Sequence, residues 1–298
     1  MSQVTQFLGS EAITSYQDAR VVILPIPYEA TTTYRKGCET GPESILDASQ
    51  QLEAYDEELG HQTCLEIGIH TVEPIADTRI DPGLDAQEML SLTSSKVKEL
   101  LRDGKYVIAL GGEHAITTGI VKAYQDFYQE TFTVVQIDAH GDMRFEFEGS
   151  IHNHACVMRR VLELGLPTLP VAIRSISQEE AKLIEEKAIP VVWDRDIAAD
   201  PDWIEKAINE IKTKKVFLTI DVDGIDPGLI PGVGTPEPGG LSWNMTLRFL
   251  KRLYQSCEVI GCDVMELAPI NDSVVSEFTT AKLIYKLIGY QSLTQKWF

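Results

Sequence analysis

The chain has 298 residues, of which 44% are hydrophobic, so it is long enough to bury a substantial core. Its 26 basic and 45 acidic residues give a formal net charge of −19, which disfavours nucleic acid and anionic membranes as partners and favours cations. No apolar run approaches the ~18 residues that a membrane-spanning helix needs.

Short apolar runs alternate with amphipathic segments along nearly the whole chain. The runs expected to form strands are 20–26, 64–70, 105–110, 132–137, 169–175, 189–193, 215–220 and 258–265. The segments expected to form helices are 85–103, 153–164, 178–188, 201–213, 243–254 and 275–289. Apolar strands separated by helices predict one α/β domain (1–298), in which helices cover both faces of a mostly parallel sheet of about eight strands.

Polar clusters directly follow three of the expected strands. The run "FTVVQI" continues into "DAHGD", "KVFLTI" continues into "DVDGIDP", and "KYVIAL" continues into "GGEH". The polar side chains concerned are Asp138, His140, Asp142, Asp221, Asp223 and His114. Ligands of open α/β sheets bind beyond the carboxyl ends of the strands, so we expect these side chains to converge.

A pair of metal ions would account for this convergence. Four carboxylates at one site repel one another, and the four positive charges of two divalent cations equal their four negative charges. Oxygen and nitrogen ligands without a thiolate suit Mn²⁺. A single Asp after a strand is more often a turn residue or a helix cap, and "DVDGID" also partly resembles a calcium loop. That loop lacks the Glu and the flanking helix of a calcium site, and three such clusters together favour two metal ions.

The motifs resemble those of the arginase/agmatinase family of ureohydrolases, and agmatinases most closely. They are "GGEH" (111–114), "DAHGD" (138–142), "TIDVDGIDP" (219–227), "DVMELAP" (263–269), "RKGCETGP" (35–42) and "GTPEPGGLSW" (234–243). Their combination is specific, although each motif alone is not. The resemblance implies a three-layer α/β/α fold, two manganese ions per subunit, and assembly into homo-oligomers, either trimers or hexamers.

The resemblance also implies a role for each matching residue. The implied metal ligands are His114, Asp138, His140, Asp142, Asp221 and Asp223, with Asp138, Asp142 and Asp221 as bridging carboxylates. Glu266 matches the acid that binds the substrate guanidinium. His154 matches the histidine that exchanges protons with solvent, and Asp142 would carry a proton to the departing amine. The simpler interpretations are a charged strand end for Glu266 and a structural or capping role for His154.

The expected reaction is hydrolysis of a guanidino compound to urea and an amine. Two metal ions can lower the pKa of water far below its bulk value of ~15.7 and so supply hydroxide at neutral pH. Arginases use an Asn shortly after the "DAHxD" motif to hold arginine, and Arg144 stands at that position here. Glu146 and Glu148 would suit a dicationic substrate, although exposed loop charges are the simpler interpretation. We therefore expect hydrolysis of agmatine to putrescine and urea.

Several alternatives remain open. Arg144 could instead anchor the carboxylate of 4-guanidinobutyrate or 3-guanidinopropionate, and His152-Asn153 stands where agmatinases often have Tyr-Ser. A non-catalytic metal-binding member of the family is another alternative, against which the complete ligand set speaks. Cys156 near His154 could indicate a cysteine hydrolase, but its apolar helical pattern favours a core position.

The expected location is the cytoplasm. The five cysteines are scattered without CxxC spacing, and an odd, dispersed set fits reduced thiols better than a disulfide framework. The first residues lack the basic flank and apolar run of a signal peptide. The expected partners are a small cationic guanidino substrate and other copies of the chain, with no nucleic acid and no membrane.

Overall fold

The structure is a computed structural model that describes residues 4–12 and 14–297. Within these residues an eight-stranded sheet has the order β2-β1-β3-β8-β7-β4-β5-β6, and every pairing is parallel. The strands are β1 (Val21–Ile26), β2 (Ile69–Thr71), β3 (Tyr106–Gly111), β4 (Thr133–Ile137), β5 (Thr168–Ile173), β6 (Val192–Trp193), β7 (Lys215–Asp221) and β8 (Glu258–Met265).

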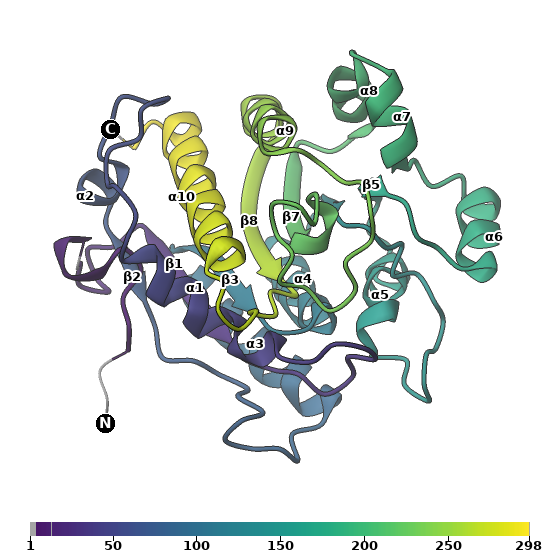
Figure 1. The fold of residues 1–298 in the computed structure, drawn as a ribbon, viewed down its shortest axis with the longest axis horizontal. Coiled ribbons are helices and arrows are strands. Elements are labelled where there is room, and N and C mark those ends of the chain that lie inside the picture. The colour runs from purple at the N-terminus through teal and green to yellow at the C-terminus, as the bar shows by residue number, and fades with distance from the viewer. Residues whose placement is uncertain (1–3, 13, 298) are drawn as a thin grey trace.

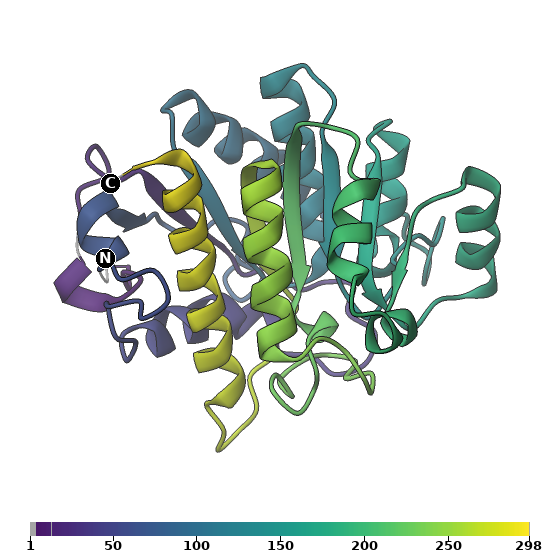
Figure 2. The same cartoon turned by 90° about the horizontal axis from the view of Figure 1, so that it is seen from above.

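Helices cover both faces of the sheet, which confirms the predicted three-layer α/β/α fold (Figures 1 and 2). One face carries α1 (Gly41–Ser49), α9 (Trp243–Ser256) and α10 (Val275–Gln295), and the other carries α3 (Ala86–Arg102), α4 (Thr117–Tyr128) and α5 (Val157–Glu163). Toward the ends of the sheet lie α2 (Thr63–Ile67), α6 (Gln178–Lys187), α7 (Asp194–Ala199) and α8 (Trp203–Glu210). No helix among the described residues is long and apolar enough to cross a membrane.

Helix α3 shows how local sequence sets these boundaries. The Asp85 side chain accepts a hydrogen bond from the backbone nitrogen of Glu88, as the capping spacing suggests. At the other end Gly104 has a φ of 71°, and the backbone nitrogens of Gly104 and Lys105 donate to Leu101 and Leu100. This left-handed cap satisfies the last carbonyls of the helix.

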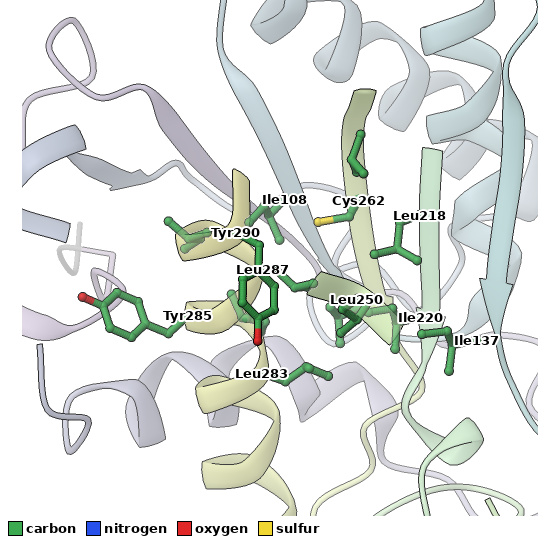
Figure 3. Close-up of a cluster of buried hydrophobic side chains, with 14 of the residues drawn as sticks. Ile108, Ile137, Leu218, Ile220, Leu250, Cys262, Leu283, Tyr285, Leu287 and Tyr290 are labelled. Atoms are coloured by element: carbon green, nitrogen blue, oxygen red, sulfur yellow. The ribbon is translucent and has the colours of Figure 1, made fainter. Parts of the chain in front are cut away.

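The core between the sheet and α10 is built from residues that are far apart in sequence. Helix α10 is buried on nearly all sides, so its apolar side chains meet both the sheet and its neighbouring helices. Figure 3 shows the side chains that pack there, among them Ile108, Leu218, Cys262, Leu250, Leu283 and Leu287. This packing holds the central strands as one rigid unit.

Some predicted elements differ from the observed ones. The predicted strand 64–70 is wrong for most of its length, because α2 covers Thr63–Ile67 and buries Cys64 and Ile67 on one face. Gly68 then takes a φ of 69°, which ends the helix before the short strand β2. The predicted strand 189–193 shortens to β6, and the sequence analysis missed α1, α4 and α7.

Two glycines allow segments of the sheet edge to approach each other closely. A Cβ on Gly112, after β3, would lie 2.1 Å from the carbonyl oxygen of Tyr28. A Cβ on Gly224, after β7, would lie 2.5 Å from the backbone nitrogen of Asp138, after β4. Both contacts are with backbone atoms, so any side chain at either position would push the strand exits apart.

We expect the substitution Gly224→Ala to destabilise the protein, because the backbone of Asp138 cannot yield without moving the end of β4. Overpacking of this kind costs roughly 1–3 kcal/mol of the free energy of unfolding, measurable by denaturant titration. Gly83→Ala is the matched control, since its Cβ would meet only a side-chain oxygen of Asp81 at 3.5 Å. Equal stabilities of the two variants would contradict this account of Gly224.

Candidate metal centre

Four neighbouring strands, β3, β8, β7 and β4, end at the same edge of the sheet. Each is followed within a few residues by polar side chains. His114 follows β3, Glu266 follows β8, Asp221 ends β7, and Asp138 follows β4. The parallel arrangement therefore brings together segments that lie far apart in sequence, at the place where the sequence analysis expected a ligand site.

The first cluster surrounds the imidazole of His114, which is completely buried. Its Nδ1 atom lies 3.2 Å from Asp138 Oδ2, 3.2 Å from Asp142 Oδ2 and 3.4 Å from Asp221 Oδ2. Among the described residues the same atom has no hydrogen-bond partner of good geometry. The other ring nitrogen, Nε2, lies 2.9 Å from the Thr219 hydroxyl, which fixes the orientation of the ring. A ring nitrogen without a partner among three carboxylate oxygens fits a divalent cation.

The second cluster surrounds His140. Its Nδ1 atom lies 2.9 Å from Asp223 Oδ2 and 3.6 Å from Asp138 Oδ1. Within His114, Asp138 and Asp221, and again within Asp138, His140 and Asp223, the candidate ligand atoms all lie within 4.8 Å of one another. Asp138 belongs to both groups because its two oxygens point to different histidines. These residues could therefore hold two metal ions that share Asp138.

The charges of the cluster are not balanced by its own side chains. Burial and the neighbouring Asp138 raise the pKa of Asp142 to about 6. Burial and the nearby carboxylates also raise the pKa of Asp221 well above its usual value. Burial opposes the protonation of His140, but Asp223 and Asp138 outweigh it and raise the pKa of that imidazole to about 12. The raised pKa values of Asp142, Asp221 and His140 indicate a site that favours added positive charge.

Two candidate catalytic residues adopt strained backbone conformations. Asp142 and Glu266 have φ values of 53° and 67°, in the left-handed region that side chains other than glycine rarely adopt. Glu266 Oε1 accepts a hydrogen bond from the backbone nitrogen of His114 at 2.8 Å and lies 3.4 Å from His154 Nδ1. Burial lowers the pKa of His154, but Glu266 outweighs it and raises that pKa to about 9.

One cavity of about 180 Å³ opens onto this edge of the sheet. It is lined by His140, Asp142, Arg144, His154, Asp221, Asp223 and Glu266, together with residues of the surrounding loops. His114 and Asp138 lie beneath it and are fully buried. The structure thus places the candidate ligands, Glu266 and His154 around a common space.

The remaining candidates lie differently. Arg144 lines the cavity, with its guanidinium 4.6 Å from the centre of the Phe147 ring. Glu146 and Glu148 are exposed and do not line the cavity, and neither does His152. Cys156 is buried, and this burial raises the pKa of its thiol to about 11. A thiol of such high pKa is a poor nucleophile, which argues against the cysteine hydrolase.

Two carboxylates that hold the site in place were not singled out from the sequence. Glu180 accepts hydrogen bonds from the backbone nitrogens of Met143 (2.8 Å) and Ser177 (2.6 Å), and so joins the loop after β4 to the start of α6. The capping-box spacing of Ser177 and Glu180 could have revealed this contact. Glu113, inside the "GGEH" motif, is completely buried and accepts three hydrogen bonds from Ala30 and Thr31.

The arginase family matches residues 19–289 of this sequence. The chain belongs to the arginase family. N(1)-aminopropylagmatine ureohydrolase of Synechocystis sp. is 65% identical to it, over 98% of this chain and 95% of the relative. The protein of that name from Thermus thermophilus is 36% identical to this chain, over 96% of this chain and 95% of the relative.

A solved structure agrees with this arginase-family assignment. The agmatine ureohydrolase of Thermoplasma volcanium has a TM-score of 0.84 and 31% identity to this chain, and the match covers 99% of this chain and 97% of the other. Both the predicted family and the predicted fold are therefore confirmed.

We expect the affinity for Mn²⁺ to rise with pH. In the cation-free protein His140 holds its proton, because its pKa is about 12, and the pKa of His114 is also raised well above its usual value. A metal ion binds only the neutral imidazole, so each histidine must release a proton on binding, and a lower proton concentration favours binding. Calorimetric titration at two pH values, in buffers of different ionisation enthalpy, measures this release. An affinity independent of pH would contradict the assignment of these histidines as ligands.

Proposed function

We propose that this arginase-family protein is a two-manganese hydrolase that cleaves a guanidino compound, N(1)-aminopropylagmatine, to urea and a linear triamine. The observation that carries the proposal is the cavity that Glu266 lines together with members of the two histidine–aspartate groups, namely His140, Asp221 and Asp223. The relative that is 65% identical bears the name of this substrate's hydrolase, which supports the choice. Agmatine, expected from the sequence, is the shorter compound of the same class.

The proposed manganese ligands are the residues of the two groups together with Asp142, which lies 3.2 Å from His114 Nδ1. They are His114, Asp138, His140, Asp142, Asp221 and Asp223. When bound, two manganese ions would supply a hydroxide nucleophile at neutral pH, because they lower the pKa of water. The oxygen and nitrogen donors of this set, with no thiolate among them, suit manganese.

The other residues would bind the cation and move protons. The Glu266 carboxylate can accept two N–H groups of a planar guanidinium at once, which orients the carbon for attack. Hydrolysis adds a hydroxide to that carbon, breaks one C–N bond and gives a proton to the departing amine. Asp142, which also lines the cavity, would carry that proton from the added hydroxyl group to the amine. His154, 18% exposed, would exchange protons with solvent.

Arg144 favours a second candidate substrate. Arg144 lines the cavity, and no carboxylate among the described residues forms an ion pair with its guanidinium. An unpaired cation would attract a carboxylate-tailed compound such as 4-guanidinobutyrate and repel the terminal ammonium of agmatine or aminopropylagmatine. Its position over the Phe147 ring moderates this repulsion, since the ring face partly compensates the charge.

A panel of substrates tests the proposed function. Urea release by the manganese-loaded protein is measured with N(1)-aminopropylagmatine, agmatine, arginine, 4-guanidinobutyrate and 3-guanidinopropionate. We expect the highest kcat/KM for aminopropylagmatine, and Arg144→Gln should leave it unchanged or raise it. A preference for guanidinobutyrate that Arg144→Gln abolishes would establish the second candidate. No urea from any compound would refute the proposed function.

Glu266→Gln should reduce kcat/KM about thirty- to a thousandfold, without loss of manganese. The amide keeps the shape of the side chain but turns one acceptor into a donor facing the donors of the guanidinium, at a cost of roughly 2–4 kcal/mol. Glu258→Gln, at the opposite end of the same strand, is the control and should retain full activity. Loss of manganese would recast Glu266 as a ligand or its support, and unchanged activity would assign guanidinium binding to another acid.

A further inference from the structure

The buried carboxylate of Glu113 links the metal centre to the loop after β1. Glu113 precedes His114 and has no exposed surface. Its Oε2 accepts hydrogen bonds from the backbone nitrogens of Ala30 and Thr31, each at 2.6 Å, and its Oε1 accepts one from the Thr31 hydroxyl at 2.7 Å. Such short contacts with a carboxylate are among the strongest hydrogen bonds in proteins, so they hold this loop firmly against the end of β3.

Thr31 extends the link to His154. Its hydroxyl oxygen accepts a hydrogen bond from the backbone nitrogen of His154 at 3.0 Å, and its carbonyl accepts one from the Asn153 side chain at 3.2 Å. His154 begins a short 3-10 helix, so its N–H has no acceptor within that helix and needs one from outside. The hydroxyl has a single hydrogen, which goes to Glu113, and this leaves a lone pair directed at His154.

We propose that Thr31 and Glu113 are positioning residues for His154. This inference rests on the proposed function, in which His154 exchanges protons with solvent. The chain of hydrogen bonds from Glu113 through Thr31 fixes the backbone of His154 and thereby keeps its imidazole 3.4 Å from Glu266. The same loop carries Thr33 to the wall of the cavity. Without these hydrogen bonds, the imidazole of His154 would move away from Glu266 while the metal ligands stayed in place.

The neighbouring residue Thr32 provides a matched control. Its hydroxyl donates to Glu29 at 2.6 Å and has no part in the link to His154. The variants Thr31→Val and Thr32→Val therefore remove the same group from adjacent positions of one loop. Only Thr31→Val leaves the Glu113 oxygen and the His154 N–H without their shared partner. Thr31→Ser restores the hydroxyl and is the rescue variant.

Two independent measurements test the proposal. The first is hydrogen exchange of the His154 amide, which does not depend on activity. It should speed up about tenfold or more in Thr31→Val and in Glu113→Gln, and stay unchanged in Thr32→Val and Thr31→Ser. The second is turnover at full manganese content. In Thr31→Val, kcat should fall about tenfold while KM changes less, and the solvent deuterium isotope effect on kcat should rise because proton exchange becomes limiting.

Equal exchange rates and equal turnover in Thr31→Val and Thr32→Val would overturn the proposal. Faster exchange of the His154 amide with unchanged kcat and isotope effect would also overturn it, because the link would then be merely structural. A wild-type protein that releases no urea would instead refute the proposed function. The exchange rates would still establish or refute the hydrogen-bond chain in that case.

Discussion

The carboxylates gathered at one edge of the sheet repel one another, and the rest of the structure compensates this repulsion. Asp138, Asp142, Asp221 and Asp223 are all buried, and the two nearby imidazoles compensate only part of their charge. Buried like charges of this kind are stable only when positive charge is added, whether as protons or as metal ions. The preference for cations is therefore a property of the folded chain, and the chemistry that we propose is a consequence of satisfying it.

The surrounding fold keeps these charges together. Strand β4 pairs with β7 over its whole length, and Gly224 lets the backbone after β7 lie against Asp138. The loops that would otherwise move apart are tied by two further carboxylates, Glu180 and Glu113, through backbone N–H groups. Strain at Asp142 and Glu266 persists because the packed sheet and these ties determine their conformation. A rigid scaffold thus supports a site whose own interactions are unfavourable in the absence of cations.

Most strands of the sheet, and the residues that follow them at its edge, could be predicted from the sequence. Apolar runs buried on both faces identify parallel strands, and the motifs after them carry the candidate ligands, so both could be predicted. The structure of the run 64–70 could not be predicted, because burial of Cys64 and Ile67 suits a helix as well as a strand. The link between Glu113 and Thr31 joins positions 82 residues apart and has no local pattern. The orientation of Arg144 depends on a contact with Phe147 that spacing alone does not reveal.

We propose that six side chains hold two manganese ions that share Asp138. Anomalous X-ray diffraction from crystals of the manganese-loaded protein, recorded on both sides of the manganese absorption edge, tests it directly. We expect two strong peaks, one among His114, Asp138 and Asp221 and the other among Asp138, His140 and Asp223. A single peak, or peaks away from these residues in fully loaded crystals, would contradict it.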